Sequence, residues 1–180
     1  QRRLIHARMD KKGIHIAALF ICILLAQVLI CNHIVLFGVA VPLIIVYFII
    51  RMPIDMNVSL LLTLSFSLGL LTDICGDTIG VNALACTITA ALRRPAFYAY
   101  VQHDDRMNQV TPDVMTLGIG TYCKYMLTLV AIYAVLIFST EYFSFADVKQ
   151  ITVLSAGSSA LTFLLILGLD SIITVRRDRH

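Results

Sequence analysis

Long apolar runs are the feature that most constrains this chain of 180 residues. Most of them approach the ~20 residues with which a helix crosses a bilayer, and they exceed the ~10 residues of a membrane β-strand. Hydrophobic residues make up 59% of the sequence and charged residues 14%, which is outside the composition of a water-soluble domain. In lipid, an isolated segment satisfies its backbone hydrogen bonds only as a helix. The sequence therefore predicts an all-α polytopic membrane protein.

Six transmembrane helices are expected within a single transmembrane domain over residues 1–180. The predicted spans cover residues 14–31, 34–50, 58–74, 79–100, 113–139 and 151–175. Only ~12 apolar residues precede Arg93 in the fourth span, too few for a ~30 Å hydrocarbon core, so this span is expected to continue past Pro95 with a kink. The first run is expected to be a retained helix because no A-x-A cleavage pattern follows it.

The basic residues are distributed unevenly between the two sides of these spans. Twelve of the 14 Lys and Arg residues lie on the side that holds both termini, and one lies on the opposite side. The positive-inside rule then predicts that both termini are cytoplasmic. The net charge of +3 follows from this bias and from contact with anionic lipids, and nucleic acid is not an expected partner.

Carboxylates and glycines interrupt the apolar sequence between residues 69 and 83, a segment that we call the hinge. Asp73 is expected to accept backbone N–H bonds where one helix ends, and Asp77 to cap the next helix. A direct contact of these residues with a partner or ligand is the alternative. Catalysis is not expected, because an acid–base pair needs two carboxylates brought together, usually from different helices.

Several stretches of the sequence resemble the rod shape-determining protein MreD family in its Bacteroides-like form. They are Leu25–Ile34, Gly69–Asp73, Gly80–Ala85 and Leu92–Pro95. Within the hinge, the residues that could contact a partner or ligand are Gly69, Asp73, Asp77, Gly80 and Asn82. Asn82 departs from the His expected in related members.

The resemblance implies a non-enzymatic membrane scaffold that helps to organise lateral peptidoglycan synthesis and cell shape. The implied partners are MreC, MreB, RodA and a class B penicillin-binding protein. The implied fold is similar to that of the substrate-binding S components of energy-coupling-factor transporters. Membrane lipids are further expected partners, and self-association into a homo-oligomer is compatible with this interpretation.

A second interpretation is that the chain is itself such an S component and takes up a vitamin or metal. The hinge and the outer loops would then line a pocket that opens to the outside. No resident cofactor or metal is expected, because the five cysteines are scattered singly and lack a histidine at ligand spacing.

Three polar residues inside the predicted spans require partners. Gln27 is expected to form an interhelical hydrogen bond, with a ligand contact as the alternative. Lys124 is expected to be bridged to Asp170, either directly or through a water or a tyrosine hydroxyl. Such a pair would act as a structural tether or as a transport relay.

The sequence Arg93-Arg94-Pro95 follows the short apolar part of the fourth span. Its guanidinium groups could dock a cytoplasmic partner or bind the phosphate of a lipid headgroup. They could also serve only as a basic anchor that fixes the topology.

Overall fold

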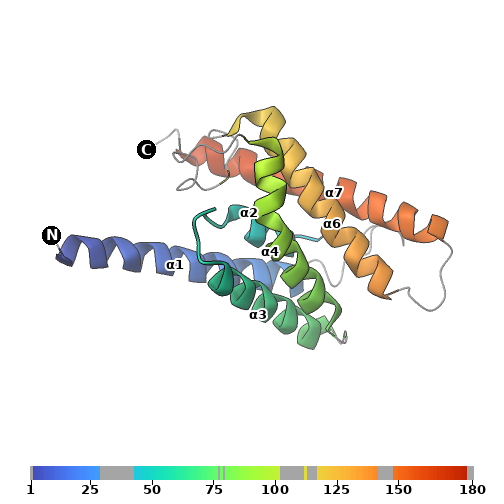
Figure 1. Ribbon diagram of the computed structural model, residues 1–180, viewed down its shortest axis with the longest axis horizontal. Coiled ribbons are helices and arrows are strands. Elements are labelled where there is room, and N and C mark those ends of the chain that lie inside the picture. The colour runs from blue at the N-terminus through green and yellow to red at the C-terminus, as the bar shows by residue number, and fades with distance from the viewer. Residues whose placement is uncertain are drawn as a thin grey trace.

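The computed structural model describes residues 2–28, 43–76, 78, 80–101, 112, 117–141 and 148–177, and these residues form helices and connecting segments without a strand (Figure 1). The helices are α1 (Arg2–Ala26), α2 (Ile45–Arg51), α3 (Val58–Gly76), α4 (Val81–Tyr100), α6 (Ile119–Glu141) and α7 (Val148–Arg177). The expected all-α class is therefore confirmed for the described part of the chain.

Among the described residues, three helices are long and apolar enough to cross a membrane. The apolar stretches are Val58–Gly76 in α3, Ile119–Thr140 in α6 and Thr152–Asp170 in α7. With a rise of ~1.5 Å per residue, each is close to the ~30 Å thickness of a hydrocarbon core. These helices indicate a membrane protein.

The bounds of α2, α4 and α6 can be compared with those of the predicted spans. α4 continues through Pro95 to Tyr100, so a helix does extend beyond the short apolar part of the fourth predicted span. α6 begins at Ile119; of the fifth predicted span, which starts at residue 113, residues 113–116 lie outside the described residues. Of the second predicted span, 34–50, only residues 45–50 are helical in the described part, because residues 29–42 lie outside the described residues.

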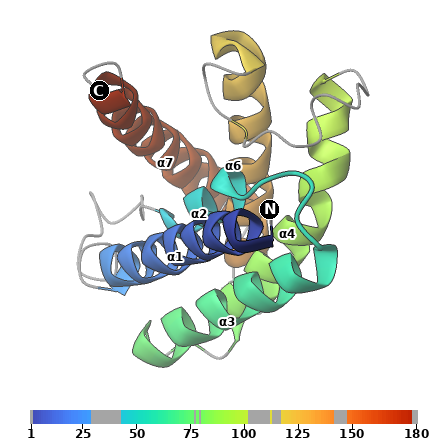
Figure 2. The ribbon, with the colours of Figure 1, turned by 90° about the vertical axis from the view of Figure 1, so that its left-hand side faces the viewer.

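α2 is short and lies in the middle of the bundle, where it contacts α1, α3, α4 and α6 (Figure 2). Its residues from Ile45 to Ile50 are all buried. The first backbone N–H groups of a helix have no partner within the helix. At the start of α2 the Ile45 N–H donates to Oε1 of Gln27, the residue that follows α1, at 3.2 Å. Two residues before α2, the Leu43 N–H donates to Oγ1 of Thr162 on α7 at 2.9 Å. Gln27 therefore makes the expected interhelical contact.

The other helices pack as consecutive neighbours, α3 on α4, α4 on α6 and α6 on α7 (Figure 1). The α3–α4 contact is closest at Gly69. A Cβ atom placed on Gly69 would lie 2.6 Å from the Ala83 Cα and 2.6 Å from the Asn82 carbonyl oxygen. Both are backbone atoms of α4, so the glycine is required by the approach of the two helices.

Gly69→Ala is expected to lower the free energy of unfolding by ~2–3 kcal/mol, because the added methyl group forces the α4 backbone away from α3. The measurement is unfolding in mixed micelles by sodium dodecyl sulfate, followed by far-ultraviolet circular dichroism. Gly168→Ala in α7 is the matched control, since a Cβ there meets nothing within 4 Å. The control should be neutral or slightly stabilising. Equal effects of the two substitutions would contradict the close approach.

Candidate functional site: two buried polar clusters

The first polar cluster forms where α3 and α4 meet, and Asp73 is its centre. The Asp73 side chain is 2% exposed. Its Oδ1 accepts hydrogen bonds from the Thr78 hydroxyl at 2.6 Å, the Asn82 backbone N–H at 3.0 Å and the Asn82 side-chain amide at 2.9 Å. Its Oδ2 accepts the Ala83 N–H at 2.8 Å. We call Asp73, Thr78, Asn82 and Tyr133 the Asp73 cluster.

The Asp73 cluster follows from the way in which the chain turns between the two helices. α3 ends at Gly76, and Gly80 precedes α4 with φ +70°, a left-handed conformation that suits glycine. The first N–H groups of α4 then point toward the end of α3. A carboxylate at this position satisfies them and interacts favourably with the positive end of the helix dipole. The predicted bonds from Asp73 to backbone N–H groups are thus present, whereas Asp77 lies outside the described residues.

Asn82 links the hinge to α6. The Tyr133 hydroxyl donates to Oδ1 of Asn82 at 2.9 Å, and the Cys86 sulfur lies 3.7 Å from the same hydroxyl. Asn82 therefore uses its amide group toward Asp73 and its oxygen toward Tyr133. Tyr133 was not among the residues expected at the hinge, although a buried tyrosine hydroxyl usually has a hydrogen-bond partner.

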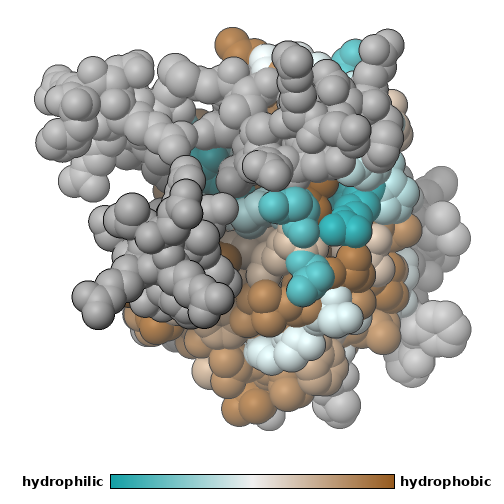
Figure 3. Space-filling view, turned by 60° about the vertical axis from the view of Figure 1, so that its left-hand side comes forward, coloured by the Kyte–Doolittle hydropathy of each residue, from teal (hydrophilic) through white to brown (hydrophobic). Residues whose placement is uncertain are grey.

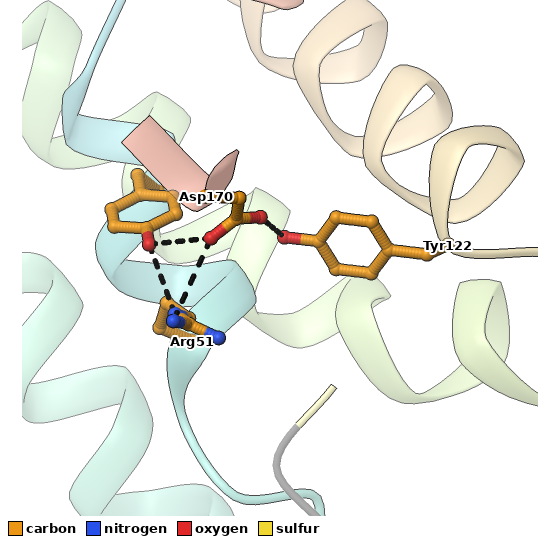
Figure 4. Close-up of polar contacts among 4 residues, drawn as sticks. Arg51, Tyr122 and Asp170 are labelled. Atoms are coloured by element: carbon orange, nitrogen blue, oxygen red, sulfur yellow. Dashed lines mark hydrogen bonds and ion pairs between the residues drawn. The ribbon is translucent and has the colours of Figure 1, made fainter. Parts of the chain in front are cut away.

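The second polar cluster joins α2, α6 and α7 through Asp170 (Figure 4). The Tyr47 hydroxyl donates to Oδ1 of Asp170 at 2.7 Å, and the Tyr122 hydroxyl donates to Oδ2. Nη2 of Arg51 lies 3.6 Å from Oδ1, and Nε of Arg51 donates to the Tyr47 hydroxyl at 2.9 Å. We call these four residues the Asp170 cluster. Asp170 is 2% exposed, so the carboxylate is buried together with its donors.

The structure does not bring Lys124 to Asp170, so the predicted direct pair is wrong. Tyr122 lies two residues before Lys124 on α6, and residues two apart do not face the same side of a helix. Tyr122 points into the bundle, and the Lys124 side chain is exposed. A tyrosine hydroxyl does contact Asp170, but the cation beside it is Arg51.

Arg93 and Arg94 both bind the segment that connects α2 to α3. Arg93 is 1% exposed and donates to the Met52 carbonyl and to the Tyr125 hydroxyl, the latter at 3.4 Å. Arg94 donates to the Ile54 carbonyl at 3.3 and 3.2 Å and to the Met56 carbonyl at 3.0 Å. These contacts were not among the roles expected for the arginines. Both guanidinium groups hold the chain's own backbone.

Pro95 lies inside α4 and is exposed. A proline within a helix has no N–H to donate to the carbonyl four residues earlier. Pro95 therefore weakens α4 next to the two arginines, and the bonds of Arg93 and Arg94 to the α2–α3 segment hold that part of the helix in place.

The two clusters are separate. Tyr122 of the Asp170 cluster and Tyr133 of the Asp73 cluster are eleven residues apart on α6, which corresponds to ~16 Å along the helix. Asp73 and Asp170 consequently do not form an acid–base pair. In the described part of the chain, no group of three or more His, Cys, Asp or Glu side chains could hold a metal ion.

The residues that complete the clusters were not predicted as site residues. They are Tyr47, Arg51, Thr78, Tyr122 and Tyr133. The available signal was the presence of tyrosines in otherwise apolar runs, since a phenol in a dry environment needs a hydrogen-bond partner. That signal does not identify the partner.

The chain matches no family model, no curated protein and no solved structure. The resemblance to MreD therefore stays a prediction from the stretches quoted above, and the function is inferred from the arrangement of the described residues.

Proposed function

We propose that this protein is a non-enzymatic, multi-pass scaffold of the bacterial inner membrane, which binds partner membrane proteins of the machinery for lateral peptidoglycan synthesis. In this proposal it has six spans, cytoplasmic termini and a fold similar to that of the S components. The expected partners are MreC, RodA, MreB and a class B penicillin-binding protein.

The observation that carries the proposal is that the buried charged groups are engaged within the chain. Asp73 accepts four hydrogen bonds, and Asp170 is held by two tyrosines and Arg51. Arg93 and Arg94 bind backbone carbonyls. These contacts join helices to one another, which supports a structural role for the polar residues.

The outer surface of the described helices supports binding through apolar contacts. Hydrophobic residues cover most of the coloured surface in Figure 3, and the hydrophilic residues gather in one part of it. Large exposed apolar side chains occur on five helices; examples are Ile21 on α1, Phe66 on α3, Leu84 on α4, Val135 on α6 and Leu164 on α7. Such surfaces contact lipid or the helices of another membrane protein.

The placement of the arginines supports the proposed orientation. Arg51 is the last residue of α2, and Arg93 and Arg94 lie in the second half of α4, next to the segment that follows α2. The three cations thus lie together at the segment between α2 and α3. By the positive-inside rule this side of the described helices would face the cytoplasm.

Purification of the tagged full chain from a rod-shaped bacterium in mild detergent tests the proposal. We expect MreC-like and RodA-like proteins to co-elute, as measured by quantitative mass spectrometry against an unrelated polytopic bait. Four variants then locate the contact surface: Phe66→Ala, Leu84→Ala, Val135→Ala and Leu164→Ala. Because binding energy concentrates in few residues, we expect one of them to reduce co-elution severalfold while the other three do not.

Two results would contradict the scaffold. One is the absence of any elongation protein in the eluate. The other is recovery of an ATP-hydrolysing energising module, which would favour the uptake transporter. The four alanine substitutions are at exposed positions, which contribute little to the free energy of unfolding. A loss of co-elution in one variant therefore reports a lost contact and not a folding defect.

A further inference from the structure

Lys124 is the one charged residue in the apolar stretch Ile119–Thr140 of α6. Its side chain is exposed. In the described part of the chain it forms no ion pair, and the buried carboxylate of Asp170 is held by Arg51 and two tyrosines. A cation on the apolar surface of a membrane helix is costly unless it reaches the interface or binds an anion.

Lys124 lies near one end of the bundle. It is five residues from the start of α6 at Ile119, or ~8 Å along the helix axis. The Thr128 hydroxyl donates to the Lys124 carbonyl at 2.9 Å, and the Tyr100 hydroxyl lies 2.9 Å from Oγ1 of Thr128. Tyr100 is the last residue of α4. A long lysine side chain at this level can place its ammonium group at the interface.

The surface beside Lys124 is open on the side toward the end of α6. Side chains of a helix tilt toward its N-terminus, so Lys124 is directed toward the residue one turn earlier, Gly120. Gly120 is exposed, and a Cβ added there would meet nothing within 4 Å. One turn deeper on the same side, Leu127 is 47% exposed. An open space, a cation and an apolar side chain thus follow one another along α6.

We propose that this part of α6 binds an anionic phospholipid, with the Lys124 ammonium on the lipid phosphate over Gly120 and the acyl chains along Leu127. The order of groups on the helix matches that of the lipid, in which the charged headgroup lies outside the chains. A carboxylate on a neighbouring transmembrane helix would suit a cation deeper in the bilayer, whereas Lys124 lies within reach of the headgroups. The proposal rests on α6 lying in a membrane and is independent of the scaffold's partners.

A single tryptophan can report the lipids at this position, because the chain contains no tryptophan. We would place Leu127→Trp in the full chain in phosphatidylcholine vesicles and measure quenching by phosphatidylglycerol or phosphatidylcholine with brominated acyl chains. We expect phosphatidylglycerol to be preferred about fivefold, the equivalent of ~1 kcal/mol for one basic residue at an anionic surface. Added inorganic phosphate should leave the quenching unchanged.

Three variants in this background test the contacts. Lys124→Met should abolish the preference, and Lys124→Arg should retain it. Gly120→Leu should reduce it with the charge unchanged, because the leucine fills the headgroup position. Leu164→Trp on α7, where the native side chain is 66% exposed, is the control reporter and should show no preference that depends on Lys124.

The proposal is overturned if Leu127→Trp is quenched equally by the two lipids, if Lys124→Met keeps the preference, or if inorganic phosphate competes with the lipid. The last result would assign the site to a free anion. Because the assay contains no partner protein, failure of the scaffold proposal would not affect its outcome.

Discussion

Replacing Asp73 with alanine is expected to lower the free energy of unfolding by ~3–4 kcal/mol. The substitution removes the acceptor for the N–H groups of Asn82 and Ala83 and for the Thr78 hydroxyl. Each buried donor left without a partner costs ~1–3 kcal/mol. We expect a total loss below the sum of the three individual costs, because water can reach the hinge between α3 and α4. The measurement is the dodecyl sulfate unfolding equilibrium described for Gly69.

Asp55→Ala provides the control for Asp73→Ala, since it makes the same chemical change at an exposed position. Its effect should stay within ~0.5 kcal/mol. The loss of unfolding free energy for Asp73→Asn should lie between those for Asp73→Ala and Asp55→Ala. The amide keeps one acceptor oxygen but turns an NH₂ group toward a hydrogen-bond donor. If Asp73→Ala were no more destabilising than Asp55→Ala, the carboxylate would not be what holds α3 to α4.

Replacing Asp170 with leucine is expected to lower the free energy of unfolding by ~3–5 kcal/mol. The loss leaves Arg51 without its buried counter-ion and removes the acceptor of the Tyr47 and Tyr122 hydroxyls. Removing one partner of a buried ion pair has effects of this size, because the other charge stays in a poorly solvated place.

A double-mutant cycle identifies the cation that belongs to Asp170. Arg51→Met and Asp170→Leu should couple by ~1–3 kcal/mol, because the two side chains are in contact. Lys124→Met and Asp170→Leu should be additive within ~0.5 kcal/mol. Coupling to Lys124 instead of Arg51 would contradict the Asp170 cluster.

The role of Asp73 could be predicted from the sequence because its interactions are local. Its donors lie only five to ten residues further along the chain. Glycines on both sides of an acidic residue, between two apolar runs, indicate a turn between helices. The first N–H groups of the second helix then require an acceptor wherever the bundle as a whole is placed.

The partners of Asp170 could not be predicted in the same way. Tyr47 is 123 residues away in the sequence and Tyr122 is 48. Depth in the membrane favours Lys124 as the partner of Asp170, but on α6 it is Tyr122 whose side chain points toward Asp170. The rotation of a helix about its axis decides which of its side chains face the core, and this rotation depends on the helices that pack against it. In an apolar span with tyrosines on more than one side, the sequence does not define the rotation.

The burial of α2 illustrates a second limit of hydrophobicity. Within the run 34–50 the described residues form the helix Ile45–Arg51, and residues 34–42 lie outside the described part of the chain. A run that is apolar throughout does not distinguish a helix in contact with lipid from one enclosed by protein. The burial of residues 45–50 arises from the surrounding helices.

The acceptors at the start of α2 have a consequence for the biosynthesis of the chain. The bond from Leu43 to Thr162 joins residues 119 positions apart. While α7 is still inside the ribosome, the Leu43 N–H lacks this acceptor, so the middle of the molecule is unfinished until nearly all of the described chain has been synthesised. Contacts of this range make assembly slow. Nascent chains stalled before residue 162 should thus keep the Leu43 N–H without the acceptor that it has in the complete fold.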